Sequence, residues 1–452
     1  MHIQFHGAVD CVTGSRHRVD IGGAHLLLDC GMFQGFKVHR ERNWAAPPAS
    51  LLEADAVVLS HAHLDHSGWL PVLVKHGWRG PVYASPATCD LAQVLLLDSA
   101  YLNEEDARRA NRYGYSKHAK ALPLYTRAEA RRALALLKPL RMGQVQRVGG
   151  ARLSLSPVGH LLGACAVRLE GGGESLLFSG DLGRDDDLLM PPPQAAPGAD
   201  VLLIESTYGN RRHAQEDVVA RLGAIVRDTI GRGGSVLLPS FAVGRAQALL
   251  LALQRLKAAG EIPAQLPVFL DSPMAIEATE LYRRHARLLR IPAREARRLM
   301  DDVHAVQTAQ QSMRLAGQRW PAVIISASGM ATGGRVLHHL KRMAPDPRHH
   351  LVFAGFQVGG SRGARIVGGE PEVKIHGEFV PIRARVSQLQ GFSGHADADG
   401  LLAWLRTMPQ APRQTYVVHG EPDAADTLRH RIQEELRWRV RVPQHGEQVQ
   451  FD

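Results

Sequence analysis

The sequence predicts an α/β protein of two domains, and three observations lead to that prediction. The chain has 452 residues, more than a single hydrophobic core usually organises. Apolar residues make up 45% of it and charged residues 22%, a balance typical of globular proteins. Short apolar runs of strand length alternate with helical patterns along most of the chain, which is typical of sheets covered by helices.

The charge balance is basic. Lys and Arg number 54 against 44 Asp and Glu, which gives a formal net charge of +10 and a pI of about 9.7. A surface with this charge attracts polyanions and favours a nucleic-acid partner. A generally arginine-rich proteome is the alternative explanation.

Cysteine spacing and hydropathy indicate a cytoplasmic protein. The four cysteines are far apart and form no CxxC pair, which argues against a disulfide framework and against a cysteine-rich zinc site; they are Cys11, Cys30, Cys89 and Cys165. The sequence shows neither a signal-peptide pattern at its N-terminus nor an uninterrupted apolar run of 18 residues. We therefore expect a protein of the reducing cytoplasm without a membrane partner.

The chain begins with short strands. Apolar alternation predicts strands over residues 3–6, 16–21 and 24–29, with a tight hairpin at Gly22-Gly23. The third strand ends at Asp29, which either turns the chain or supports a neighbouring site. A fourth, continuous apolar run over residues 56–60 predicts a buried strand.

Four metal-ligating side chains follow this fourth strand within six residues. They are His61, His63, Asp65 and His66. A loop at a strand end can direct several ligands into one site, because the sheet behind it holds the backbone in place. Imidazole and carboxylate together suit zinc or a neighbouring first-row metal. The alternative is a polar turn that happens to contain three histidines.

Helical and strand patterns then alternate. We expect a helix over residues 70–76, a strand over 81–84, and helices over 89–105 and 126–138. The polar segment 103–120 is either a solvated surface or a rim that touches substrate. Its tyrosines and basic residues suit contact with single-stranded nucleic acid; they are Arg108, Arg109, Arg112, Tyr113, Tyr115, Lys117 and His118.

Three more strand ends carry polar groups. His160 follows the run 154–158, Asp181 follows 176–178, and Glu205 ends the run 201–204. Taken singly, each is more often a structural residue than a ligand.

From residue 210 the pattern is that of a separate, doubly wound parallel α/β domain. Strands precede the segments that contain Ser240 and Arg245, Asp271, and the glycine-rich turn at residues 327–335. Ligands of such sheets bind at the carboxyl ends of the strands. Unpaired backbone N–H groups in a glycine-rich loop before a helix can hold a phosphate, and an ordinary tight turn is the alternative. The last part of the chain adds Gly394-His395 and Val418-His419, again at strand ends.

These motifs, in this order, resemble the metallo-β-lactamase fold and, within it, the β-CASP nucleases. The resemblance rests on HAHLDH at 61–66, the acid Glu205 as motif A, PSFAVGRAQ, DSPMA and SGMATGGR in the insert, His395 as motif B and His419 as motif C. It implies an αββα sandwich with a nested β-CASP domain. We expect a first metallo-β-lactamase part at 1–205, the β-CASP domain at 206–370, and a C-terminal part with RNA-specificity motifs at 371–452.

The resemblance also implies a site with two zinc ions. One ion would take His61, His63 and His160, the other Asp65, His66 and His419, and Asp181 would bridge them. His395 would be the general acid, with Glu205 tuning it and Asp29 orienting the metal loop. Such a pair of ions lowers the pKa of a bridging water and stabilises the oxygens of a phosphodiester. RNA phosphates would contact Ser240, Arg245, Ser328, Gly329 and Arg335.

By this resemblance the protein is a ribonuclease that cuts single-stranded RNA, mainly endonucleolytically, in RNA processing or decay, and leaves 5′-phosphate and 3′-hydroxyl ends. DNA-preferring members carry valine in place of His419, which points to RNA. The alternatives are a small-molecule hydrolase of lactones, thioesters or β-lactams, and a non-catalytic RNA-binding paralogue. The sequence leaves the RNA target, any exonuclease activity and the oligomeric state open, a homodimer among the alternatives.

Overall fold

The computed structural model describes residues 1–114, 116, 118–214, 216–318, 320–355 and 357–451. Tyr115 and Lys117, which the sequence pattern singled out, lie outside the described residues. The chain forms two compact units. The first comprises Met1–Asp185, Pro191–Arg212 and the chain from His395 onward, and the second comprises Asp186–Met190 and His213–Gly394.

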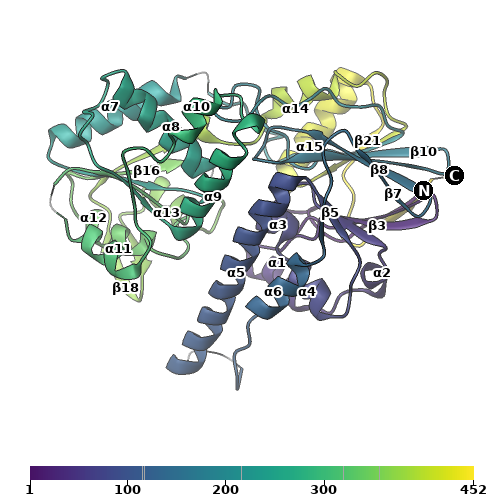
Figure 1. The fold of residues 1–452 in the computed structure, drawn as a ribbon, viewed down its shortest axis with the longest axis horizontal. Helices are drawn as coiled ribbons and strands as arrows, with labels where there is room; N and C mark the ends of the chain where they lie inside the picture. The colour runs from purple at the N-terminus through teal and green to yellow at the C-terminus, as the bar shows by residue number, and fades with distance from the viewer. Residues whose placement is uncertain (115, 117, 215, 319, 356, 452) are drawn as a thin grey trace. The chain divides into compact units, whose positions relative to one another are not determined.

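The first unit contains two seven-stranded sheets (Figure 1). One has the order β22 (Gln448–Gln450), β1 (His2–Phe5), β2 (His17–Ile21), β3 (Ala24–Leu28), β4 (Ala56–Val58), β5 (Val82–Ala84) and β6 (Leu137–Pro139). The other has the order β21 (Val440–Arg441), β20 (Gln414–Val418), β11 (Val201–Glu205), β10 (Glu174–Phe178), β9 (Cys165–Gly171), β8 (Ala151–Pro157) and β7 (Val145–Val148).

Apolar side chains from both sheets form one shared core. It includes Val19 and Leu26 of the first sheet and Leu155, Val167 and Leu203 of the second, all fully or almost fully buried. Helices cover the outer face of the first sheet through a separate core. The helices of this unit are α1 (Lys37–Glu41), α2 (Ala49–Leu52), α3 (Leu64–Ser67), α4 (Leu70–Lys75), α5 (Pro86–Tyr113), α6 (Arg127–Leu134), α14 (Ala398–Leu405) and α15 (Pro422–Arg431). The predicted α/β class and two-sheet sandwich are confirmed.

Several strands that precede the predicted ligands run parallel to one another. In the second sheet β10, β11 and β20 are adjacent and parallel, so their carboxyl ends meet at one edge. In the first sheet β3 and β4 are also adjacent and parallel. The β2–β3 hairpin has the predicted Gly22-Gly23 turn, with both glycines in the left-handed region at φ 57° and 74°.

The metal loop after β4 is fixed by a close backbone approach. The amide N–H of Ser15 donates to the carbonyl oxygen of Asp65 at 2.8 Å, and that of Cys30 donates to the carbonyl oxygen of His66 at 2.8 Å. Gly31 lies so near this loop that a Cβ atom there would fall 1.6 Å from the Asp65 oxygen. Only glycine therefore lets the two segments pack in this way.

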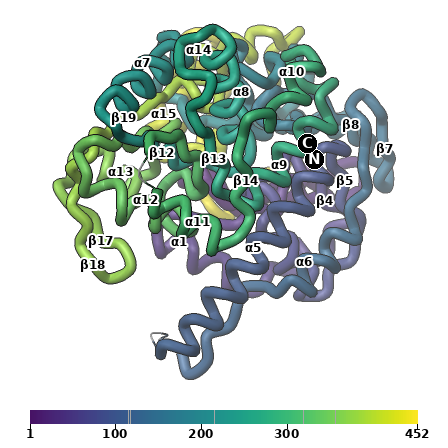
Figure 2. The backbone as a smooth tube through the Cα atoms, turned by 60° about the vertical axis from the view of Figure 1, so that its left-hand side comes forward, coloured from purple at the N-terminus to yellow at the C-terminus, as the bar shows by residue number. Residues whose placement is uncertain are grey.

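The second unit is built on a parallel sheet (Figure 2). Its order is β14 (Val303–Ala305), β13 (Val268–Asp271), β15 (Val323–Ser326), β12 (Val236–Pro239), β16 (His350–Ala354) and β19 (Arg385–Leu389). A hairpin of β17 (Glu372–Ile375) and β18 (Glu378–Pro381) is separate. The helices are α7 (Val218–Gly231), α8 (Arg245–Ala258), α9 (Pro273–Arg284), α10 (Ala293–Arg297), α11 (Ala309–Ala316), α12 (Val336–Met343) and α13 (Arg362–Val367).

Some expected boundaries differ from the structure. The helix expected over 126–138 ends at Leu134, because Leu137–Pro139 pair with the parallel strand β5, where the Val82 amide donates to the Leu136 carbonyl oxygen at 2.9 Å. The domain boundary was expected at residue 370, whereas the compact second unit continues to Gly394, because β19 pairs with β16. Among the described residues, none of the helices combines the length and the apolar composition that crossing a membrane needs.

Candidate metal centre and its surroundings

Two groups of donor atoms lie side by side in the first unit. The first consists of His61, His63, His160 and Asp181, and the second of Asp65, His66 and His419; within each group the donor atoms lie within 4.8 Å of one another. The His63 Nδ1 atom lies 3.1 Å from His61 Nε2 and 3.3 Å from His160 Nε2. In the second group the two Nε2 atoms of His66 and His419 lie 3.0 Å apart. The structure thus brings together all seven residues expected to bind metal.

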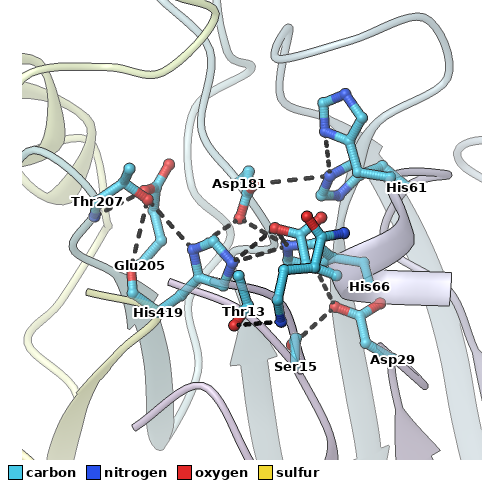
Figure 3. A network of polar contacts seen from close by, with 12 residues as sticks. Thr13, Ser15, Asp29, His61, His66, Asp181, Glu205, Thr207 and His419 are labelled. Atoms are coloured by element: carbon cyan, nitrogen blue, oxygen red, sulfur yellow. Dashed lines mark hydrogen bonds and ion pairs between the residues drawn. The ribbon is translucent and has the colours of Figure 1, made fainter. Parts of the chain in front are cut away.

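Asp181 lies between the two groups (Figure 3). Its Oδ2 atom is 3.6 Å from His61 Nε2 and 3.7 Å from His160 Nε2. Its Oδ1 atom is 3.3 Å from His66 Nε2 and 3.5 Å from His419 Nδ1. This Oδ1 atom is buried and accepts no hydrogen bond from the described residues. A buried carboxylate with one oxygen directed at each donor group fits a bridge between two cations.

The charge state of the histidines agrees with a cation site. Burial and the neighbouring His66 lower the pKa of His61 well below its usual value, and burial lowers the pKa of His63 to about 4. Both imidazoles are therefore neutral, which is the form that binds metals. Burial also opposes a charge on His66, yet Asp181 and Asp29 raise its pKa well above the usual value. The buried carboxylates of Asp181 and Asp29 thus require positive charge nearby, from a proton or from a metal ion.

Asp29 holds the metal loop from behind. Its Oδ2 atom accepts hydrogen bonds from His66 Nδ1 at 2.7 Å and from the hydroxyls of Ser15 and Ser60 at 3.1 and 3.0 Å. Its Oδ1 atom accepts the Ser60 amide at 2.7 Å. These contacts orient His66 so that Nε2 faces the second donor group. The sequence could place Asp29 at a strand end, but it contained no signal for the two serines.

His395 and Glu205 form a third polar group beside the first two. The Nδ1 atom of His395 lies 3.3 Å from Glu205 Oε1 and 4.0 Å from Asp181 Oδ2. Burial disfavours a charged His395, but the carboxylates of Glu205, Asp181 and Asp65 together outweigh it, and the pKa of His395 is raised. Glu205 is fully buried and accepts the amide N–H groups of Leu182 at 2.7 Å and Thr207 at 3.1 Å. Hence His395 can carry a proton next to the metal groups.

The five residues expected to hold RNA phosphates all lie in the second unit, where four of them make intramolecular contacts through their side chains. Ser240 donates to the Phe241 carbonyl oxygen at 2.9 Å, and Ser328 bonds the Thr332 hydroxyl at 3.0 Å. Arg245 donates to the carbonyl oxygen of Ala354. Gly329 packs against Phe241, so that a Cβ atom would lie 2.8 Å from the Phe241 nitrogen. Their contact with phosphate stays a prediction.

Arg335 has a structural role that the sequence did not reveal. Its guanidinium donates to Asp271 Oδ1 at 2.8 Å and to the carbonyl oxygens of Val306 and Gln307 at 2.9 and 2.6 Å. Asp271 is fully buried and also accepts from His339 Nε2 at 2.7 Å. These bonds fix the end of the glycine-rich loop to the neighbouring strand.

Three family models match the chain. They are the metallo-beta-lactamase superfamily over residues 17–209, the Beta-Casp domain over 246–366 and the Zn-dependent metallo-hydrolase RNA specificity domain over 380–443. Together with the two donor groups, these matches define a metallo-hydrolase that carries a nested second domain.

Similarity to named proteins assigns the chain to a narrower family within this superfamily. Ribonuclease TTHA0252 of Thermus thermophilus is 40% identical over 435 residues, which cover 94% of each chain. With this similarity, the chain belongs to the β-CASP ribonuclease family of the metallo-β-lactamase superfamily. The transcription termination factor FttA of Methanosarcina mazei is 30% identical over 448 residues, 95% of this chain and 68% of that protein. A crystal structure of a protein of unknown function from Enterococcus faecalis shares the fold, with a TM-score of 0.56, 15% identity and 99% coverage of both chains.

Thr207 is a residue near the metal groups that the sequence prediction passed over. Its hydroxyl lies 3.2 Å from His419 Nδ1 and 3.3 Å from the His419 carbonyl oxygen. When the hydroxyl donates to the carbonyl oxygen, its own oxygen accepts Nδ1–H, and the Nε2 lone pair is left for the second donor group. His419 itself has a left-handed backbone, φ 52°, so this side-chain contact helps to fix its direction.

We therefore predict that Thr207→Val, which keeps the shape and removes the hydroxyl, weakens zinc binding at the group of Asp65, His66 and His419 about 10- to 100-fold. Thr207→Ser keeps the hydroxyl and should bind zinc as the wild type does. Competition with a chromophoric zinc chelator measures both. Equal zinc affinity in the Val and Ser variants would show that the Thr207 contact has no part in holding His419.

Proposed function

We propose that this chain hydrolyses phosphodiester bonds of single-stranded RNA with two zinc ions held by the seven donor residues. The observation that carries the proposal is the position of Asp181, with one carboxylate oxygen toward each imidazole group. Membership of the β-CASP ribonuclease family and the RNA specificity domain at 380–443 identify the activity as that of a zinc-dependent RNA nuclease. The named relative Ribonuclease TTHA0252 supports RNA as the substrate of this chain too.

The donor set suits a pair of zinc ions. His61, His63 and His160 would hold one ion, Asp65, His66 and His419 the other, and Asp181 both. When bound, the ions polarise a water molecule and the scissile phosphate, and they stabilise the charge of the attacking and leaving oxygens. Imidazole and carboxylate donors in this number are typical of zinc in hydrolytic sites.

His395 and Glu205 supply the proton for the leaving oxygen and hold it in position. His395 carries a proton at its imidazole, and Glu205 keeps that proton in place through the 3.3 Å contact at Nδ1. The Nε2–H group would then donate its proton to the 3′ oxygen as that oxygen leaves the phosphorus. We propose that cleavage is mainly endonucleolytic and yields 5′-phosphate and 3′-hydroxyl ends.

Two other functions are less well supported. A small-molecule hydrolase of this fold needs no second domain, whereas this chain matches the Beta-Casp domain over 246–366. A non-catalytic RNA-binding paralogue would have lost donor groups, whereas all seven converge here.

Chelation and end-group analysis test the proposed reaction. Single-stranded RNA labelled at either end should be cut by the wild type, spared after treatment with a chelator, and cut again after zinc is added. Because water is the nucleophile, a substrate with one 2′-deoxy sugar at the scissile position should still be cleaved, and the products should carry 5′-phosphates. A 2′,3′-cyclic phosphate end, or resistance of the deoxy substrate despite normal binding, would contradict the proposal.

The role of His395 makes a separate prediction. His395→Ala should slow single-turnover cleavage by about 10² to 10⁴-fold, the usual contribution of a general acid, while the zinc content of the protein stays the same. His304→Ala, at an exposed position of the second unit, is the control and should cut at the wild-type rate. If the His395→Ala variant cuts within a few fold of the wild-type rate, another group protonates the leaving oxygen.

A further inference from the structure

The helix α5 begins beside the metal centre and runs away from it. The hydroxyls of Ser85 and Thr88, at its first turn, both donate to the carbonyl oxygen of Gly163 at 2.7 and 2.9 Å, three residues after His160. The helix has 28 residues, so it is about 42 Å long. Figures 1 and 2 both show its distal half projecting beyond the rest of the first unit.

The two halves of α5 differ in burial. Up to Ala100 the helix buries a regular apolar face, whereas beyond it only Ala107 and Ala110 of the helix are buried. The chain that returns from the distal end is tied to the helix by Asn111, whose side chain bonds the backbone of Ala121 at 2.8 and 2.9 Å. The distal half is therefore an ordered arm with most of its circumference in solvent.

The exposed side chains of the arm form two parallel rows. Tyr101, Arg108 and Arg112 have the spacing i, i+7, i+11, which places them on one face of a helix. Leu102, Arg109 and Tyr113 repeat the same spacing one residue further on. Tyr101, Leu102 and Tyr113 are 44%, 50% and 68% exposed, which is unusual for large side chains on an ordered helix.

Acidic and basic side chains of the arm are equal in number, but not every arginine is in contact with a carboxylate. Glu105 pairs with Arg108, and Glu104 pairs with Arg127 at 2.9 Å. No carboxylate of the described residues lies within 4.0 Å of Arg109 or Arg112. The Arg112 guanidinium lies 5.6 Å from the centre of the Tyr113 ring, and that of Arg127 lies 5.8 Å from the Tyr101 ring. Asp106 on the same helix attracts Arg109 electrostatically, without a contact within 4.0 Å. Two arginines with no carboxylate in contact thus lie among exposed aromatic rings.

We propose that the distal half of α5 is a second binding surface for single-stranded RNA, outside the metal centre. This inference rests on the proposed ribonuclease function. Arg109 and Arg112 contact phosphates, and Tyr101 and Tyr113 offer flat surfaces on which bases stack without regard to sequence. Residues 109–113 lie about 35–40 Å along the helix from its first turn, a span of roughly ten stacked nucleotides. Only a long RNA can reach both the metal centre and the arm.

The test compares RNA lengths. The variant is Arg109→Ala/Arg112→Ala, and the control Arg141→Ala/Arg147→Ala removes the same charge from exposed positions outside α5. The substrates share one cleavage site and are about 8 and about 40 nucleotides long, shorter and longer than the span of the arm. We expect the arm variant to raise KM for the long RNA about 10-fold and to leave the short one unchanged. Its salt slope should fall by about 1.4, for two lost phosphate contacts.

The result separates this inference from the ribonuclease function itself. If the wild type cuts both RNAs and the arm variant matches the control on each, the arm does not bind RNA. An equal loss on both lengths, or a change in the molecular mass of the protein in solution, would also overturn the inference, the latter by showing that the arm meets a second copy. If the wild type cuts neither RNA, the proposed function is what fails.

Crosslinking locates the contact directly. A long RNA that carries photoreactive uridines, bound to the His395→Ala protein to prevent cleavage, should attach to the peptide that contains Tyr113. Tyr113→Ala should remove that crosslink. Attachment only to peptides outside residues 101–113 would refute the proposal.

Discussion

The buried carboxylate of Asp181 is the group on which the rest of this structure depends. It is 2% exposed, it faces imidazoles on both sides, and its Oδ1 atom accepts no hydrogen bond from the described residues. An isolated carboxylate in such a place would cost several kcal/mol of stability, so the fold must supply positive charge around it. Metal ions held by the five imidazoles of the two donor groups would meet that requirement, since the neutral imidazoles of His61 and His63 carry no charge themselves.

The sheet topology explains how residues far apart in sequence reach Asp181. The strands β10, β11 and β20 run parallel, and their carboxyl ends present Asp181, Glu205 and His419 at one edge. Four further donors come from the loop after β4, which is held by Asp29 and by the close approach at Gly31, and His160 follows β8. Rigid strands thus fix the positions of the metal-binding residues, and short loops orient their side chains.

Much of this arrangement could be predicted from the sequence, because strand ends are visible as apolar runs that stop at a polar residue. The motif order predicted the sandwich, the nested domain and the donor residues that the structure brings together. Contacts that involve ordinary residues could not be predicted. Thr207, Ser15 and Ser60 have no pattern of their own, and their roles depend on which backbone they meet in three dimensions.

The local sequence pattern also gave wrong element boundaries where tertiary contacts decide the conformation. Residues 137–138 continue a helical pattern, yet they form β6 because a neighbouring strand offers hydrogen bonds. The helix expected to end at residue 105 continues to Tyr113, since nothing in the sequence there terminates it before Gly114, whose φ of 65° suits a helix end. For Arg335, whose phosphate contact stays a prediction, the sequence pattern did not indicate the bond to a buried aspartate.

The count of metal ions in active protein tests the central claim most directly. Protein purified without added chelator, freed of loosely bound metal and assayed on labelled RNA in the same preparation, should contain two zinc ions per chain by elemental analysis. Full activity with one zinc ion or fewer per chain would contradict a centre in which Asp181 joins two ions.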